Sequence, residues 1–451
     1  MTDRFAGKKH TITITRRYVV FFIPYLLPPP RPQTPYPETS VKSTNQPAIS
    51  PARDAAIQIL YRVMSSAAHS DDLLHSPAVN RLSPEDRNLT TALVLGVLRW
   101  QLQLDAVLRP MLQRPDAELH DAALLALRLG IFQLLHMDRI PPHAAIHESV
   151  EMARANGAPH AAGMVNAILR RVQREKETPK RTPLVVTLTP EEQAHPEWLL
   201  SRWRKNFGNA AARRIATYDQ QEPPSGQLYT PEEGLPHIDD GSRLIAELTA
   251  AAVPNPKRIL DCCAAPGGKT AVLAIRHPQA EIIACDISPK RLEAMRKRMD
   301  RAESTKHVKT LLADMTNPPA ELQAKKFDLI LCDAPCSGTG TLARNPEIRH
   351  RLRESDLPRQ ADRQKAILNQ ALRLLAPGGR LVYSTCSLEP EENLEVVKAT
   401  TAAGTYRSID LTSLLPESAA SAAIDGTLRT LPGTQPCDGF FAALLEKAIT
   451  T

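Results

Sequence analysis

Two cysteines stand where a reactive thiol would be useful, each directly after a short apolar segment. Cys336 lies in LCDAPCSGTG (331–340) and Cys386 in YSTCS (383–387). If the two apolar segments are neighbouring parallel strands, both thiols would face one cleft at the same edge of the sheet. A thiolate is a strong nucleophile, whereas a buried free cysteine more often behaves as a small apolar residue. By that default the remaining cysteines are core or wall residues, namely Cys262, Cys263, Cys285 and Cys332, while Cys437 has no interpretation.

A glycine-containing turn lies upstream of these cysteines, in the string DCCAAPGGKT (261–270). The pattern predicts a strand, a Gly-Gly turn and then a helix. Glycines allow close approach of a ligand to the backbone, and a helix N-terminus favours a carboxylate, such as the methionine end of S-adenosylmethionine. The spacing of a phosphate-binding P-loop is missing, and a plain tight turn is the alternative. The predicted cofactor contacts here are Cys263, Ala264, Ala265, Pro266, Gly267, Gly268 and Lys269.

Two acidic residues end the next two candidate strands. Asp286 follows the glycine turn by roughly 20 positions, which suits a hydrogen bond to a ribose diol. Asp314 ends the third candidate strand, from which it would reach an adenine amino group. For both residues the alternative is a helix-capping carboxylate.

Short apolar segments alternate with helical patterns from residue 258 onward, which predicts a parallel, doubly wound α/β sheet. The candidate strands are 258–264, 281–287, 308–314, 328–334, 380–386 and 439–447. Ligands of such sheets bind at the carboxyl ends of the strands. The motifs above all lie at those ends.

The first part of the chain has a different periodicity. Segments 52–64, 87–108, 122–137 and 143–155 carry apolar residues with helical spacing, and Ser83 before Glu85 and Asp86 indicates a helix start. The expected organisation is a disordered proline-rich extension at 1–50, an all-helical domain at 51–174, a linker and connector at 175–237, and an α/β domain at 238–451.

Composition is compatible with an RNA partner and gives no indication of a metal. The net charge is +7, and a basic balance permits binding to phosphates without requiring it. All seven cysteines fall between 262 and 437 without a paired C-x-x-C, which favours reduced thiols in a cytoplasmic protein over disulfides or zinc. RRYVVFFIPYLL (16–27) resembles a signal-peptide core, but it is interrupted by proline, lacks a cleavage site and is too short to cross a membrane.

With these motifs in place, the chain resembles the RsmB-type (Sun or Fmu) RNA cytosine-5 methyltransferases, which modify 16S ribosomal RNA. The matching strings are DCCAAPGGKT, ACDIS, LLAD, LCDAPCSGTG, STCSLEPEEN and CDGFFAALL. Two strings of the helical part, RIPPHAAIHESVEMA (139–153) and GMVNAILRRV (163–172), look like the NusB-like RNA-binding domain of that family.

The resemblance implies a function and a division of labour. A class I methyltransferase domain would transfer the methyl group of S-adenosylmethionine to carbon 5 of a cytosine in 16S ribosomal RNA, as enzymes of the cytosine-967 type do. Cys386 would add to carbon 6, Cys336 would assist product release, Asp333 would assist at N3 of the base and contact the cofactor, and Lys269 would lie near the same pocket. A monomer without metal or membrane is expected. The alternatives are a transfer RNA substrate, or RNA binding in ribosome assembly without catalysis.

Two further features of the sequence bear on how RNA would bind. Between Asp219 and the strand at 258 the chain lacks several dozen residues that relatives carry, including a small β-rich region. The basic stretch from Arg344 to Arg353 would either guide RNA or form the solvated start of a charged helix.

Overall fold

The computed structural model describes residues 49–66, 68–177 and 188–447. The expectations for the extension at 1–50 and for the signal-like segment at 16–27 therefore fall almost entirely outside the described residues. Part of the predicted linker, residues 178–187, lies outside them as well.

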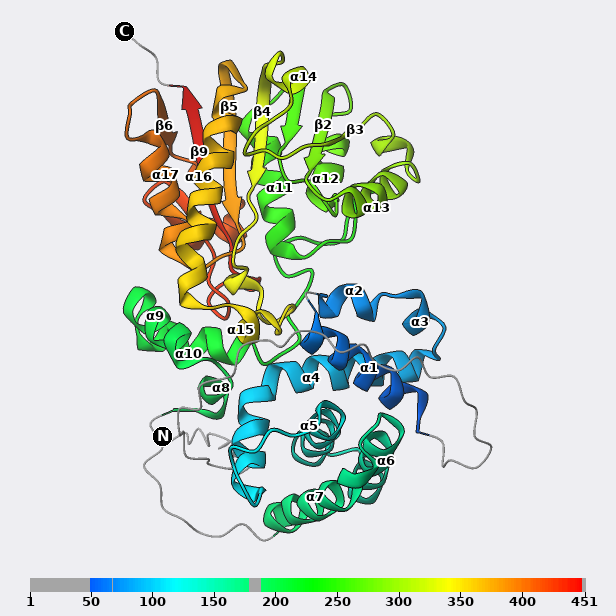
Figure 1. Ribbon diagram of the computed structural model, residues 1–451. Helices are drawn as coiled ribbons and strands as arrows, with labels where there is room; N and C mark the ends of the chain where they lie inside the picture. The colour runs from blue at the N-terminus through cyan, green and yellow to red at the C-terminus, as the bar shows by residue number, and fades with distance from the viewer. Residues whose placement is uncertain (1–48, 67, 178–187, 448–451) are drawn as a thin grey trace, which may run out of the picture.

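A helical domain comes first (Figure 1). Its helices are α1 (Pro51–Ser65), α2 (Ser70–Leu74), α3 (Pro77–Asn80), α4 (Pro84–Leu108), α5 (Asp121–His136), α6 (Pro142–Ala155) and α7 (Ala162–Glu177). As predicted, Ser83 caps α4, where its side chain accepts a hydrogen bond from the backbone NH of Asp86. The apolar faces of these helices form one core, as predicted, that includes Leu60, Leu93 and Leu127.

One segment of this domain, Pro84–Met111, is apolar and long enough to cross a membrane by length and composition. It consists of α4 and the short helical turn after it, and 56% of its most apolar window is buried inside the protein. That burial is typical of a core helix of a helical domain.

From residue 188 on, the connector contains α8 (Pro190–Gln193), α9 (Glu197–Phe207) and α10 (Asn209–Tyr218). After α10 the chain runs without a strand to α11 (Asp240–Ala252) and β1 (Arg258–Asp261), within the described residues. The small β-rich region that the resemblance led us to expect in relatives therefore has no counterpart between α10 and β1.

The C-terminal part of the chain is built on a mixed sheet. Its strands after β1 are β2 (Glu281–Asp286), β3 (Lys309–Leu312), β4 (Phe327–Asp333), β5 (Leu375–Thr385), β6 (Tyr406–Ile409), β7 (Ala423–Ile424), β8 (Thr427–Arg429) and β9 (Phe441–Lys447). Among the described residues the order is β3-β2-β1-β4-β5-β9-β8-β7, with β6 also paired to β9. The pairs from β3 to β5 are parallel as predicted, but β9 runs antiparallel to β5, and the β6 to β8 strands were not predicted.

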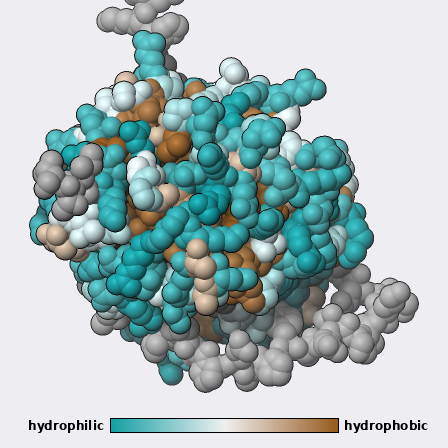
Figure 2. All heavy atoms as spheres, turned by 90° about the horizontal axis from the view of Figure 1, so that it is seen from above, coloured by the Kyte–Doolittle hydropathy of each residue, from teal (hydrophilic) through white to brown (hydrophobic). Residues whose placement is uncertain are grey.

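Helices cover both faces of this sheet. The remaining helices are α12 (Gly268–Arg276), α13 (Pro289–Met299), α14 (Ala320–Gln323), α15 (Ile348–Arg351), α16 (Leu357–Arg373) and α17 (Leu394–Thr401). Successive residues of a strand face opposite sides: Ile259 packs with α11 and α12, and Leu260 packs with α16 and α17. Seen from the end of the molecule opposite the helical domain, the surface is largely hydrophilic with small apolar patches (Figure 2).

The order of the strands reverses direction between β1 and β4, because the chain builds outward from β1 to β3 and then returns to β4. Such a switch point is where open α/β sheets bind ligands. The loops that follow β4 and β5 lie on the side of the sheet that faces the helical domain, where Arg99 donates to the carbonyl oxygen of Ala343 at 2.6 Å (Figure 1).

The middle of the basic stretch, from Arg349 to Arg351, joins the two domains, which corrects both predictions for these residues, while Arg353 is exposed. Arg349 is 1% exposed and donates to backbone carbonyls of Arg99, Ala194, Asp219 and Leu342 at 3.1–3.4 Å. Arg351 donates to carbonyls at the end of α1, and His350 contacts the carbonyl of Leu98. These side chains are held by protein carbonyls instead of facing RNA or solvent.

We predict that Arg349→Met lowers the free energy of unfolding by about 2–4 kcal/mol, because it leaves several buried carbonyls without a donor. Urea denaturation followed by fluorescence measures the change. Arg359→Met, at a site where the arginine side chain is 78% exposed and pairs with Asp356 three residues away, is the control and is expected to change stability by less than about 0.5 kcal/mol. Equal effects of the two substitutions would contradict the assigned role of Arg349.

Candidate active site

The predicted glycine turn lies at the end of β1 and leads into α12. Gly267 has φ +98°, a conformation that other residues rarely adopt, and a side chain there would collide with Met295 and Met299. The backbone NH of Ala264 donates to the carbonyl of Cys285 at 2.7 Å, and Gly267 donates to the carbonyl of Ala264. The turn is therefore fixed against the ends of β2 and α13. Of the residues predicted to contact a cofactor, Ala264 and Ala265 are buried, Pro266 is exposed and Cys263 is partly exposed.

The two predicted acidic ligands differ in their surroundings. Asp286 is 4% exposed, and its carboxylate accepts hydrogen bonds from the backbone NH groups of Ser288, at 2.8 Å, and Ala265, at 3.2 Å. Ser288, rather than Asp286, caps α13. Asp314 is exposed and accepts from both the backbone NH and the hydroxyl of Thr316, a local contact of the capping type.

The ends of β2 and β3 fit a nucleoside. Asp286 and Leu312 are register partners in the sheet, and the apolar side chains of Leu312 and Ile287 are 53% and 51% exposed. Large apolar side chains that stay exposed next to a carboxylate provide a surface for a flat ring beside an acceptor for hydroxyl groups. The residues present thus fit the adenosine part of S-adenosylmethionine, and the N-terminus of α12 fits its carboxylate.

Lys269 and Asp333 form an ion pair, with Lys269 Nζ 2.8 Å from Asp333 Oδ2. The other carboxylate oxygen of Asp333 accepts from the hydroxyl of Ser384 at 2.8 Å, and the ammonium group also lies over the ring of Phe440. Burial alone would lower the pKa of Lys269, but the carboxylates of Asp333 and Asp239, with a smaller contribution from Cys386, raise it well above its usual value. Lys269 is therefore a permanent cation that acts electrostatically on Cys386.

The two predicted reactive cysteines meet. Cys336 Sγ lies 3.4 Å from Cys386 Sγ, one from the loop after β4 and the other directly after β5. The hydrogen bond with Cys386, burial and the charge of Glu392 raise the pKa of Cys336 well above its usual value. Either sulfur can be the donor in this contact. Because Glu392 acts on Cys336 and Lys269 interacts with Cys386, the two identical side chains have different surroundings.

The other cysteines are placed differently. Cys262, Cys285 and Cys332 are buried, as predicted for core residues. Cys437, for which there was no prediction, is buried as well. Burial raises the pKa of Cys285 and of Cys437 to about 12, which makes both poor nucleophiles. Within the described residues no group of histidine, cysteine or acidic side chains could hold a metal ion.

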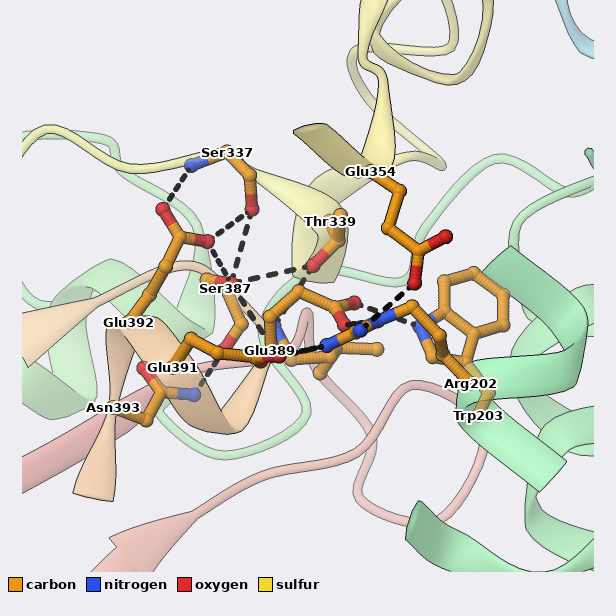
Figure 3. Close-up of polar contacts among 11 residues, drawn as sticks. Arg202, Trp203, Ser337, Thr339, Glu354, Ser387, Glu389, Glu391, Glu392 and Asn393 are labelled. Carbon is orange, nitrogen blue, oxygen red and sulfur yellow. Dashed lines mark hydrogen bonds and ion pairs between the residues drawn. The ribbon is translucent and has the colours of Figure 1, made fainter. Parts of the chain in front are cut away.

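A polar network behind the two reactive thiols was missed at the level of sequence. Figure 3 shows Glu392 beside Ser337 and Ser387, the residues that follow Cys336 and Cys386, and Glu389 beside Arg202 and Trp203 of α9. The string STCSLEPEEN contains all these acidic positions. The available signal was the presence of several carboxylates directly after an apolar strand, where charge needs partners.

The fold and the site together define a class I S-adenosylmethionine-dependent methyltransferase joined to a helical domain. Residues 249–446 match the model of the family described as 16S rRNA methyltransferase RsmB/F, and residues 50–174 match the NusB family. The chain belongs to the RsmB/F methyltransferase family. The predicted fold class and the predicted enzyme class, an S-adenosylmethionine-dependent RNA methyltransferase, are thereby confirmed.

Relatives extend over nearly the whole chain. The ribosomal RNA small subunit methyltransferase B of Xanthomonas campestris is 33% identical over 440 residues, covering 88% of this chain and 97% of the relative. A probable ribosomal RNA small subunit methyltransferase B of Bacillus subtilis is 30% identical and covers 88% and 98%. The crystal structure of PH0851 has the same fold, with a TM-score of 0.68 at 22% identity, covering 89% of this chain and all of that one.

We predict a pH-dependent difference between the protein and its Asp261→Asn variant. Asp261, at the end of β1, is 1% exposed, and burial raises its pKa to about 7. This pKa lies above the value of about 4 expected in the unfolded chain. The contribution of Asp261 to the free energy of unfolding is therefore fully present below about pH 4, falls as the pH rises, and is lost once the pH has passed 7. Asparagine does not titrate, so the variant should gain on the order of 2 kcal/mol relative to the parent between pH 5 and pH 8.

Thermal unfolding of both proteins across this range measures the difference. Other groups titrate equally in the two proteins and cancel. Parallel stability curves would show that Asp261 is ionised throughout, contrary to the prediction.

Proposed function

We propose that this protein methylates carbon 5 of a cytosine in small-subunit ribosomal RNA, with S-adenosylmethionine as the methyl donor and Cys386 as a covalent nucleophile. The observation that carries the proposal is the pair of sulfur atoms 3.4 Å apart beside the Lys269–Asp333 ion pair. The substrate class follows from the relatives, which are named as ribosomal RNA small subunit methyltransferases.

The chemistry gives each group a task. Carbon 5 of cytosine is a weak nucleophile until a thiolate adds to carbon 6. Cys386 Sγ forms this C–S bond, and the cation Lys269 stabilises the thiolate before it reacts. Asp333 is held by Lys269 and Ser384. When its carboxyl group carries a proton, the OH donates to N3 of the base, which takes up the electrons that move into the ring.

Bound S-adenosylmethionine supplies an electrophilic methyl group, which carbon 5 takes up. Gly267, Gly268 and Lys269 at the start of α12, with Asp286 and Asp314 at the strand ends, would hold the cofactor. The carbon-5 proton would then pass to solvent water, the C5–C6 double bond would form again, and the C6–S bond would break with its electron pair returning to Cys386. Cys336, whose pKa is raised, is a protonated neighbour that assists this release by hydrogen bonding to the departing sulfur.

The target must be reachable by a thiol at a strand end. A base inside a duplex cannot contact Cys386, so the cytosine must be splayed out of a loop or of RNA not yet covered by ribosomal proteins. We further propose that the protein acts as a monomer in the cytoplasm, where both thiols stay reduced.

Two measurements test the reaction. Purified protein is incubated with methyl-labelled S-adenosylmethionine and unmodified 16S ribosomal RNA, with transfer RNA in parallel, and ribosomal RNA of cells with and without the gene is compared by bisulfite sequencing. Label at carbon 5 of a cytosine in the ribosomal RNA supports the proposal. Label confined to transfer RNA, or tight binding without label, overturns it.

We predict opposite phenotypes for the two cysteine variants. Cys336→Ala should accumulate an RNA–protein adduct that survives denaturing gels, because addition proceeds while release is slowed. Cys386→Ala should form no adduct and lose at least about 1000-fold in methyl transfer, since the nucleophile is gone. Cys285→Ala, which removes a buried thiol of β2, is the control. An adduct that persists without Cys386 would reverse the assignment.

A further inference from the structure

One buried carboxylate contacts the loops that carry both reactive thiols. Glu392 is 0% exposed. Its Oε1 accepts from the backbone NH of Ser337 at 2.8 Å, and its Oε2 accepts from the hydroxyls of Ser337 and of Ser387, the latter at 2.5 Å. Figure 3 shows the carboxylate between the two serines, which come from different loops.

Each serine directly follows a thiol in the chain: Ser337 follows Cys336, and Ser387 follows Cys386. Consecutive Cα atoms are about 3.8 Å apart across a trans peptide bond, so a displacement of either serine moves its cysteine. The two hydroxyl oxygens also lie 3.0 Å from each other. The distance between the sulfur atoms therefore depends on the length of a bridge from serine to carboxylate to serine.

The bridge is itself supported from outside. Gln364 of α16 donates to Glu392 Oε1 at 3.0 Å and to the carbonyl of Pro335 at 2.9 Å. The hydroxyl of Tyr383 donates to the backbone carbonyl of Glu392 at 2.6 Å. Helix α16 thus holds the carboxylate of Glu392, and β5 holds its backbone.

Stability alone does not require a charge at this position. Burying a carboxylate has a large desolvation cost, and an uncharged group of similar shape is often as stable or more so. The negative charge of Glu392 also contributes to the raised pKa of Cys336. A buried charge that contacts both thiol loops and acts on one thiol indicates a role in arranging the reactive pair.

We propose that Glu392 is a positioning residue that sets the separation of Cys336 and Cys386. Its effect on methyl transfer rests on the proposed function, whereas its effect on the distance between the sulfur atoms does not. Loss of the bridge should let the loops move independently and should slow the steps that use both thiols together.

The first test measures the thiol pair without the methylation reaction. Phenylarsine oxide condenses with two thiols to form two As–S bonds with release of one water and no oxidation, so it binds best where two sulfurs are already close. Binding is followed by intact mass and by competition with a small dithiol. In the full chain, Glu392→Ala should weaken arsenical binding at least about tenfold, the loss expected when a hydrogen bond to a charged group is removed.

Controls separate the bridge from general damage. Glu392→Gln keeps the shape and one acceptor, so it should retain most of the arsenical affinity, while Glu395→Ala changes an exposed carboxylate of α17 and should match the parent. Cys336→Ala reports background from other thiols. If Glu392→Ala does not fold, the Ser337→Ala and Ser387→Ala variants remove one arm of the bridge each and should each lower the affinity.

The second test uses methyl transfer. Glu392→Ala should lower kcat at least about 30-fold with KM for RNA within about threefold, because a carboxylate that is 0% exposed would act on the thiols and not on the binding of RNA. Glu392→Gln should recover part of kcat and move the pH dependence of the reaction to lower pH, since Cys336 then ionises more easily.

Unchanged arsenical binding and unchanged kcat in a folded Glu392→Ala protein would overturn the proposal. If Glu392→Ala weakens arsenical binding but the parent protein shows no methyl transfer, the positioning role of Glu392 stands and the proposed function is rejected. A loss of kcat in Glu392→Ala without any change in arsenical binding would also overturn the positioning role.

Discussion

The reactive pair depends on a place where three backbones touch without room for a side chain. The NH of Gly340, in the loop after β4, donates to the carbonyl of Cys386 at 2.9 Å, and the NH of Gly439, before β9, donates to the carbonyl of Gly340 at 2.8 Å. A Cβ atom on Gly340 would lie 2.2 Å from the carbonyl oxygen of Gly439. Only glycine permits this close approach. It brings the loop of Cys336 against Cys386 and places both loops against the segment just before β9.

The helical domain and the connector pack against the same loops. Glu389, three residues after Cys386, accepts from Trp203 and Arg202 of α9, and Arg349, downstream of Cys336, is bonded to carbonyls of the helical domain and connector. The helical domain is therefore coupled to the thiol loops through buried polar contacts. Although its connector is short, this protein keeps α9 in contact with the loop that follows Cys386. RNA bound to the helical domain would therefore lie at a defined position relative to Cys386.

The sequence predicted the elements well and their long-range contacts poorly. Strands such as β1 and β4 are short, apolar and followed by turn residues, so periodicity identifies them and the parallel arrangement follows. The antiparallel direction of β9 is not encoded in its own residues, because an apolar strand pairs in either direction. Arg349 was expected to face RNA or solvent, since nothing near it in sequence indicates the carbonyls of Ala194 and Asp219 that bury it. Motif strings located Cys336 and Cys386, but the role of Glu392 depends on a bridge between loops 50 residues apart in sequence.

Two identical side chains need different surroundings if one is to be a nucleophile and the other a proton carrier. The structure supplies this asymmetry with charges from opposite sides. The cation Lys269, anchored to Asp333, acts on Cys386, while the buried carboxylate of Glu392 acts on Cys336. Because both charges are largely withdrawn from water, their fields are weakly screened and reach the sulfur atoms with little loss. In the proposed reaction, exchanging the roles of the two cysteines would require exchanging these charges, so the proposed order of steps rests on where the fold buries Lys269 and Glu392.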